Sequence, residues 1–425
     1  MAPSSWPRAA KIGAAIAALL SAGGVAAYLV LRSKPANISH PNIPFRAQPP
    51  PRPRAAPDRF VWPIFGYDPA RTQTLPASRH FHGPWRRRWT KRGVVLTEFS
   101  PIMAGPTIYW LKNDGNVFAL DKRRGHERWH RRLGVLAAAS PAWHRGSIYV
   151  VLLKRAKNVN AGRVAALDVR RGHIRWKRDL PARSESSPIV VHGLVIFGTE
   201  DGTVYAVHES NGRTAWTYHA SGAVKGGLAL SGGTLYFGDY NGKVYAIRAR
   251  DGAQVWQTTT SGASGGLGSG NFYATPAVAF GRVYMGNTDS RVYSFSQATG
   301  KLAWATGTGH YVYGSAAVTN VPHLGPTVYV GSYDGNFYAF DARSGNIRWQ
   351  HAAGGRISGS STVVGSTVYF ADLGDRDTIG LDVRTGHQVF RLADGAFTAV
   401  ISDGRWLFVN GYASLYALSP RGSRH

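Results

Sequence analysis

Asp372, Asp375 and Asp377 form the densest acidic stretch of the chain, and Arg376 lies within it. Carboxylates at this spacing are the ligand type that calcium prefers, but a calcium site takes roughly six to eight oxygen ligands. The stretch directly follows a strand-like run, Val368-Tyr369-Phe370. We therefore interpret it as a solvated hairpin turn, with a weak calcium site as the alternative.

Three histidines, His126, His173 and His387, are the other candidate metal ligands. Each occupies the same turn of a repeated unit, so the three lie on different copies of the repeat and do not converge on one ion. We interpret them as turn residues that the repeat encodes. The chain has no Gly-x-x-x-x-Gly-Lys phosphate-binding loop, and we predict that the protein has no catalytic residues and is not an enzyme.

The elements that carry these residues belong to a tandem repeat of about 40 residues. The units 186–220 and 226–260 align without a gap, and further units start near Ser100, Ser140, Ala274, Ser315 and Ser360. Each unit has an alternating aromatic run, and in four units Asp-Gly or Asn-Gly follows it, which tolerates the positive φ angles of a two-residue hairpin. Four short strands in each unit are typical of a propeller blade.

Each unit ends on a strand that carries a large aromatic residue. These residues are Trp129, Trp176, Trp216, Trp256, Trp304 and Trp349, with Phe390 in the place of the next tryptophan. An eighth unit starts at Val400 and stops before its fourth strand, and the segment Trp85 to Arg92, with Trp89, is the candidate that supplies it. We therefore predict an all-β, eight-bladed β-propeller whose ends join in one blade, with seven blades as the alternative.

The end of each unit reads Ala-x-Asp-x-x-(Thr/Ser)-Gly-x-x-x-Trp, and the copy from Ala339 to Trp349 matches it best. This pattern resembles the tryptophan-docking repeat of the pyrroloquinoline-quinone-like propeller superfamily, over about residues 62–420. The segment Trp62 to Asp68 resembles the opening motif of its bacterial members. The resemblance implies that the eight aromatic residues are structural: each tryptophan stacks on the neighbouring blade and buries apolar area between twisted sheets.

The superfamily contains two functional classes. Quinoprotein dehydrogenases bind pyrroloquinoline quinone and calcium on the propeller axis, and non-catalytic scaffolds include the propeller subunit of the outer-membrane β-barrel assembly machinery. The dehydrogenases usually carry a vicinal disulfide beside the cofactor, whereas this chain has no cysteine. We therefore expect a scaffold without a cofactor. The quinone with calcium is the enzyme alternative, and a ligand-sensing or wall-polymer-binding ectodomain is the third.

The formal net charge is +27, and 33 of the 50 Lys and Arg residues lie in the first 185 positions. If the ring closes as predicted, the basic residues of three adjacent blades lie near one another. We expect them to form a surface for an anionic partner, such as lipid headgroups or a wall polymer, rather than nucleic acid. The candidate residues are Arg86, Arg87, Arg88, Arg123, Arg124, Arg128, Lys154, Arg155 and Lys157.

Residues 12–31 form an uncharged apolar stretch of 20 residues, the length of a transmembrane helix. We predict an uncleaved single-pass anchor there, after a short tail at 1–11; a cleaved signal peptide and a buried helix are the alternatives. The proline-rich segment 32–58 is predicted to be a semi-rigid stalk, and 59–425 the propeller. Because long domains translocate largely regardless of flanking charge, we expect the propeller to lie outside the cytoplasm. We also expect a protein partner, which the sequence does not identify.

Overall fold

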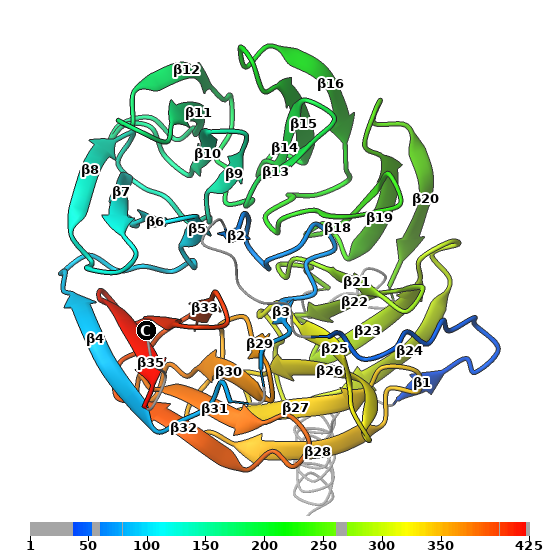
Figure 1. The fold of residues 1–425 in the computed structure, drawn as a ribbon. Coiled ribbons are helices and arrows are strands. Elements are labelled where there is room, and N and C mark those ends of the chain that lie inside the picture. The colour runs from blue at the N-terminus through cyan, green and yellow to red at the C-terminus, as the bar shows by residue number, and fades with distance from the viewer. Residues whose placement is uncertain (1–36, 53–59, 79, 261–269, 399, 422–425) are drawn as a thin grey trace, which may run out of the picture.

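The computed structural model describes residues 37–52, 60–78, 80–260, 270–398 and 400–421, which contain strands and no helix. The strands form eight sheets arranged as a ring, each with four antiparallel strands, and β3(Thr74–Leu75) adds to one of them in parallel (Figure 1). The predicted eight-bladed propeller is therefore confirmed, and the seven-bladed alternative is wrong. The second and third strands of most blades are buried on both faces, because each blade packs between two others, while the fourth strands are largely exposed.

Blades 1 to 4 follow one another along the chain, each with its first strand nearest the axis. Their strands are β5(Ile102–Ala104), β6(Thr107–Leu111), β7(Asn116–Asp121), β8(Glu127–Arg132); β9(Ala142–His144), β10(Ser147–Leu152), β11(Arg163–Asp168), β12(Ile174–Asp179); β13(Ile189–Val191), β14(Leu194–Gly198), β15(Thr203–His208), β16(Thr214–His219); β17(Ala229–Ser231), β18(Thr234–Gly238), β19(Lys243–Arg248), β20(Gln254–Thr259).

Blades 5 to 7 repeat this order, and blade 8 takes its fourth strand from the N-terminal part of the chain. Their strands are β21(Ala277–Ala279), β22(Arg282–Asn287), β23(Arg291–Ser296), β24(Leu302–Gly307); β25(Ala317–Val321), β26(Gly325–Gly331), β27(Asn336–Asp341), β28(Ile347–Ala352); β29(Thr362–Val364), β30(Thr367–Ala371), β31(Thr378–Asp382), β32(Gln388–Leu392); β33(Val400–Ser402), β34(Leu407–Asn410), β35(Leu415–Pro420) and β4(Trp85–Lys91).

Strand β4 closes the ring by pairing antiparallel with β35, as predicted. In Figure 1 the two strands, which come from opposite ends of the described chain, lie side by side. The register pairs Lys91 with Leu415 and Trp85 with Pro420. This pairing covers the edge that β35 would otherwise present to solvent.

The antiparallel order of each blade sorts its loops onto two faces of the ring. The hairpins between the second and third strands and the links between blades lie on one face, which we call the link face. The turns between the first and second strands and between the third and fourth strands lie on the other, which we call the turn face.

The axis of the ring is crossed by the segment 60–77, which includes β2(Val61–Trp62) and β3(Thr74–Leu75) and which we call the plug. Its carbonyl groups accept hydrogen bonds from the first strands of blades 1, 2, 4, 5, 6 and 7, for example Pro63 from Trp143 N and Thr72 from Val318 N. At its centre Arg71 is almost fully buried, and its guanidinium donates to the carbonyls of Phe65, Ser187, Pro188 and Leu228.

Part of the predicted stalk lies against blade 5. Strand β1(Ile38–Ser39) pairs with β24, and Arg282 donates from Nε to Pro44 O over 2.7 Å and from Nη2 to Ile43 O over 2.6 Å. The predicted anchor at 12–31 lies outside the described residues. Within the residues that the structure does describe, there is no helix of the length and apolarity needed to cross a membrane.

Candidate functional site

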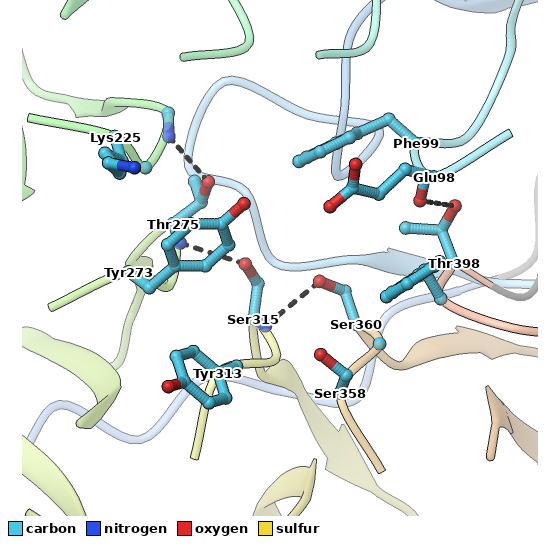
Figure 2. Close-up of a pocket in the computed structure, with 14 residues that line it drawn as sticks. Glu98, Phe99, Lys225, Tyr273, Thr275, Tyr313, Ser315, Ser358, Ser360 and Thr398 are labelled. Atoms are coloured by element: carbon cyan, nitrogen blue, oxygen red, sulfur yellow. Dashed lines mark hydrogen bonds between the residues drawn. The ribbon is translucent and has the colours of Figure 1, made fainter. Parts of the chain in front are cut away.

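A pocket lies at the centre of the link face, where the links between blades converge above the plug (Figure 2). It encloses about 40 Å³, which is room for a few water molecules. The residues that line it are Glu98, Phe99, Lys225, Gly226, Gly227, Tyr273, Thr275, Tyr313, Ser315, Ser358, Gly359, Ser360, Phe397 and Thr398.

The hydroxyl groups of this pocket fasten adjacent blades together. Figure 2 shows Thr275 N donating to Ser315 Oγ over 2.9 Å, and Ser315 N donating to Ser360 Oγ over 3.0 Å. On the opposite side of the axis Ser140 N donates to Ser187 Oγ in the same way, over 2.9 Å. These residues recur just before the first strand of every blade except blade 4, where Gly227 takes the position, so the repeat builds a belt of hydroxyl groups around the axis. Their role in this belt is structural.

An ionic network lies beside the pocket. Lys225 Nζ is 2.9 Å from Glu185 Oε1 and 2.9 Å from Glu200 Oε1, and Tyr273 OH donates to Glu185 Oε2 over 2.8 Å. Burial raises the pKa of the Glu185 carboxyl, with a further rise from the hydrogen bond that it shares with Glu200. In Glu200 the hydrogen bonds from Glu185 and Lys225 outweigh burial and lower the pKa. Lys225 thus forms ion pairs with two carboxyl groups at once.

Glu98 is the carboxyl group that points into the pocket (Figure 2). Burial raises its pKa, although Asn113 Nδ2 donates to its Oε2 over 3.2 Å. A carboxyl group in a pocket with a raised pKa is a candidate for proton transfer. No second group in the described network stands ready to use that proton, because Glu185, Glu200 and Tyr273 are already bonded to Lys225 or to one another.

The described residues do not fit pyrroloquinoline quinone with calcium. No group of three or more His, Cys, Asp or Glu side chains in the described chain is placed to hold a metal ion. The ammonium group of Lys225 pairs with both Glu185 and Glu200, so these two carboxylates are already neutralised by a cation of the chain. A tricyclic cofactor needs a pocket of roughly 300 Å³ or more, several times the space at the axis.

A row of tyrosines extends from the pocket across the link face of blades 4 to 6. The ring of Tyr273 lies 6.3 Å from that of Tyr240 and 5.8 Å from that of Tyr313, and Tyr313 lies 4.8 Å from Tyr333. Lys225 lies over the Tyr240 ring at 5.1 Å. We call this set the tyrosine row. Half-buried aromatic residues of this kind are enriched in protein interfaces.

Two sequence patterns that suggest metal ligands have other roles in the structure. His126 to His130 read His-Glu-x-x-His, a pattern that binds zinc on a helix; here it enters strand β8, and His130 Nδ1 contacts Glu127 Oε1 at 2.6 Å. The carbonyls of His126, His173 and His387 accept the turn hydrogen bonds of blades 1, 2 and 7, as expected of turn residues.

The acidic stretch is the hairpin between β30 and β31, as predicted, but only its tip at 374–376 is solvated. Asp372 and Asp377 are buried, and burial raises the pKa of Asp372. Arg391 Nε donates to Asp377 Oδ2 over 2.6 Å, and its Nη2 lies 3.5 Å from Asp375 Oδ2. The calcium alternative has no support in the described residues, where no such ligand group occurs.

The structure places seven of the eight predicted docking residues over the turn of the next blade. Trp304 is representative: a methyl group on Gly345 would come within 2.6 Å of its ring, and Trp304 Nε1 donates to Ala342 O over 3.1 Å. The other pairs that touch in this way are Trp89 with Gly125, Trp129 with Gly172, Trp176 with Gly212, Trp216 with Gly252, Trp256 with Gly300 and Trp349 with Gly386. Trp216 lacks the hydrogen bond.

Phe390 is the exception, and topology supplies the reason. The turn on which it would dock lies between the third and fourth strands of blade 8, but β35 and β4 come from different ends of the chain. The described part of the chain has no turn there, and a second pocket of about 400 Å³ lies at this seam.

The nine candidate basic residues do not form one patch. Arg123 and Arg124 lie on the turn face, whereas Lys154, Arg155 and Lys157 lie in the β10–β11 hairpin on the link face. Several are bound within the chain: Arg87 lies over Tyr416 and Arg88 over Trp406, Arg128 pairs with Asp121, and Arg155 pairs with Asp179. Arg86, Arg123, Arg124 and Lys157 are exposed, and no side-chain partner for them occurs among the described residues.

The sequence analysis missed the plug, the Lys225 network and the tyrosine row. The plug has no repeat and no periodicity that would show its path. The network did leave a signal, since Glu185 and Lys225 are 40 residues apart. That separation is the repeat length, so the two residues occupy equivalent positions in adjacent units.

Similar solved structures share the fold at low sequence identity. BamB from Moraxella catarrhalis is 18% identical, with a TM-score of 0.65, over 81% of this chain and 100% of that one. A europium-containing methanol dehydrogenase is 14% identical, with a TM-score of 0.71, over 85% and 98% of the two chains. The quinohemoprotein alcohol dehydrogenase ADHIIG from Pseudomonas putida HK5 is 16% identical, with a TM-score of 0.68, over 86% and 81%.

No curated protein matches the chain in a sequence search. The family model described as outer membrane protein assembly factor BamB matches residues 84–218, 134–306 and 219–424. These matches cover all eight blades and include the tryptophans that pack on the turns of neighbouring blades. The chain is therefore a member of the BamB family of pyrroloquinoline-quinone-like repeat propellers.

Proposed function

We propose that the protein is a non-catalytic interaction scaffold, held at a membrane by residues 12–31 with its propeller on the extracytoplasmic side. Its link face contacts a protein partner through the tyrosine row and the rim of the central pocket. The family is described as outer membrane protein assembly factor BamB, and an assembly role is the function that we carry over from it.

The observation that carries the proposal is the filled axis. The plug, the hydroxyl belt and the Lys225 network leave about 40 Å³ at the point where the ring is open. Arg71 binds four carbonyls of the plug and of blades 3 and 4, so opening the axis leaves several buried polar groups unpaired. A rigid ring with a filled axis presents surfaces and has little room for a substrate.

A titration separates this function from the oxidoreductase alternative, which the two dehydrogenase structures of the same fold favour. The full chain in detergent is titrated calorimetrically with pyrroloquinoline quinone in the presence of calcium. We expect no saturable heat. Stoichiometric, calcium-dependent binding would replace the scaffold with a quinone-dependent dehydrogenase.

Site-specific crosslinking tests the link face directly. A photoreactive amino acid is placed at Tyr333 in the tyrosine row and, as a control, at Arg250, whose side chain is 84% exposed on the turn face. We expect Tyr333 to crosslink reproducibly to one envelope protein and Arg250 to give no crosslink to that protein. Equal crosslinking from both positions would contradict the assignment of the link face.

We also propose that the exposed bases Arg123 and Arg124 on the turn face assist contact with an anionic surface, such as lipid headgroups or wall polymer. Screening weakens such contacts as salt rises. Binding of the full chain to anionic vesicles should therefore fall with ionic strength, and a double variant with Arg123→Gln and Arg124→Gln should bind less at low salt. An unchanged affinity in the variant would remove this part of the proposal.

A further inference from the structure

The seam between blades 7 and 8 lacks the contacts that recur at other seams. Phe390 stands where a tryptophan is expected, and it has no turn on which to dock. Tyr329 of blade 6 donates to Val383 O of blade 7 over 2.7 Å, and Tyr284 of blade 5 makes the same bond to Ala342 O over 3.1 Å. Tyr369, their counterpart in blade 7, makes no such bond across the seam within the described chain; its hydroxyl interacts with Thr367 of its own blade.

In two other blades an arginine occupies the corresponding position and is held within its own blade. In blade 6, Arg348 Nη2 lies 2.5 Å from Asp341 Oδ2 and donates to Pro326 O over 3.2 Å. In blade 1, Arg128 Nη2 lies 2.7 Å from Asp121 Oδ2 and 3.5 Å from Pro106 O. An aspartate and a carbonyl of the same blade thus hold one guanidinium group.

Blade 7 keeps both acceptors and lacks the arginine. Asp382 occupies the position of Asp341, and Ser366 O occupies that of Pro326 O, because Val383 N donates to it as Ala342 N does to Pro326 O. The arginine position holds Val389, which is 56% exposed. Asp382 Oδ1 accepts the turn hydrogen bonds from Arg384 N and Thr385 N. No partner for Asp382 Oδ2 occurs among the described residues.

These acceptors lie in the pocket of about 400 Å³ at the seam, which we call the seam pocket. Aromatic rings form much of its wall: Phe390 lies 6.2 Å from Trp85 and 5.5 Å from Tyr369. The residues that line it are His82, Gly83, Pro84, Trp85, Ser366, Thr367, Tyr369, Asp382, Val389 and Phe390. None of the lining residues is a lysine or an arginine, although the chain as a whole is strongly basic.

We propose that the seam pocket binds an arginine side chain of a partner protein. The guanidinium group would take the place that Arg348 and Arg128 fill within their own blades, paired with Asp382 Oδ2 and donating to Ser366 O. Its planar face would stack on the aromatic wall, an arrangement that suits arginine better than lysine. The site lies at the rim of the ring and does not depend on the role proposed for the link face.

The test uses a fluorescent pentapeptide with one central arginine and the full chain in detergent, with binding followed by fluorescence polarisation. A peptide with citrulline, which has the same shape without the charge, is the matched probe. We expect saturable binding of the arginine peptide, and binding of the citrulline peptide that is at least about tenfold weaker. Equal binding of the two peptides would overturn the proposal.

Variants place the binding in the pocket. Asp382→Asn keeps the turn hydrogen bonds through Oδ1 and should weaken arginine binding about tenfold. Val389→Arg should fill the site from within the chain, abolish binding and raise the melting temperature, whereas Val389→Met should leave binding unchanged. Asp341→Asn, which breaks the corresponding pair in blade 6, is the control and should have no effect on binding. Binding that survives Val389→Arg would contradict the site.

The chain also has Arg79 and Arg424, which lie outside the described residues. If the wild type binds no peptide but Arg79→Gln or Arg424→Gln does, an arginine of the chain itself occupies the pocket and the partner is excluded. Absence of binding in all of these proteins would overturn the proposal outright.

Discussion

The turn glycines carry two requirements that no other residue type meets at once. At Gly345 the φ angle is +79°, a region in which side chains with a Cβ are strained, and the ring of Trp304 covers the place where a Cβ would lie. Gly146 has nearly the same φ angle, +80°, but nothing lies within 4 Å of its Cβ position. The two glycines therefore separate backbone strain from blade docking.

We expect Gly345→Ala to destabilise the propeller by about 3 kcal/mol or more, because the new methyl group both strains the backbone and displaces a buried tryptophan. Gly146→Ala should lose only about 1 kcal/mol, the strain alone. Urea unfolding followed by tryptophan fluorescence measures both. Equal losses in the two variants would mean that the tryptophan contact contributes little to stability.

Single residues also show where sequence reasoning reaches its limit. The replacement of tryptophan by Phe390 is visible in the sequence, because the repeat gives it a position to be compared with. The pocket behind it is not visible, since it arises where β35 and β4 meet without a turn, which is a property of ring closure. Glu98, Glu185 and Lys225 come from three different links between blades. Only the assembled ring brings Glu98 and Lys225 into one pocket, with Glu185 paired to Lys225 beside it.

At the scale of elements, the plug links the blades to one another. Each blade is a separate sheet, and the plug forms hydrogen bonds with six of them. Arg71 alone contacts blade 3 through Ser187 and Pro188 and blade 4 through Leu228. Burial lowers the pKa of Arg71 to about 9, so at neutral pH the guanidinium keeps its proton and all of its donors. The repeat pattern could not predict this segment. The plug contacts six blades within 18 residues, so its sequence cannot follow the repeat of about 40 residues that defines the blades.

We expect Arg71→Met to destabilise the propeller by about 3–5 kcal/mol, because it leaves four buried carbonyl groups without their donor. Arg250→Met, at a side chain that is 84% exposed, is the matched control and should change stability by less than about 0.5 kcal/mol. Thermal unfolding of the two variants beside the wild type gives the comparison. A plug that contributes nothing to stability would leave both variants at the wild-type melting temperature.

At the scale of the whole molecule, the repeat accounts for the ring and the departures from the repeat account for its sites. Eight similar units dictate eight blades, and the missing fourth strand of the last unit dictates closure by the N-terminal strand β4. The chemistry collects where units differ: the plug, the link-face pocket and the seam pocket. The charge of the molecule follows no such rule, which is why a basic region of the sequence divides between two faces of the ring.

The stability of the ring at low pH depends on two kinds of carboxyl group. Folding lowers the pKa of one kind and raises the pKa of the other, so their contributions to stability change with pH in opposite directions. In Asp341, hydrogen bonds from Ser344 N and Arg343 N and the charge of Arg348 outweigh burial and lower the pKa below 3.8; the pKa of Asp121 and of Asp168 is lowered as well. The unfolded chain then binds protons first, so this stability is present above pH 3.8 and is lost as pH falls through the folded pKa. Glu98 has the opposite sign: burial raises its pKa above 4.5, and its contribution is present below pH 4.5 and lost as pH rises.

Two isosteric variants should therefore shift the pH profile of the melting temperature in opposite ways. Asp341→Asn should lower the melting temperature at pH 6 and approach the wild type as pH falls below 3.8, because the wild type progressively loses the same ion pair there. Glu98→Gln should match the wild type near pH 4 and exceed it at pH 7, because it removes a buried carboxylate that lies near Glu185 as well as Lys225. Scanning calorimetry from pH 3 to 8 tests both signs at once. Profiles that run parallel to that of the wild type at every pH would show that neither carboxyl group is coupled to folding.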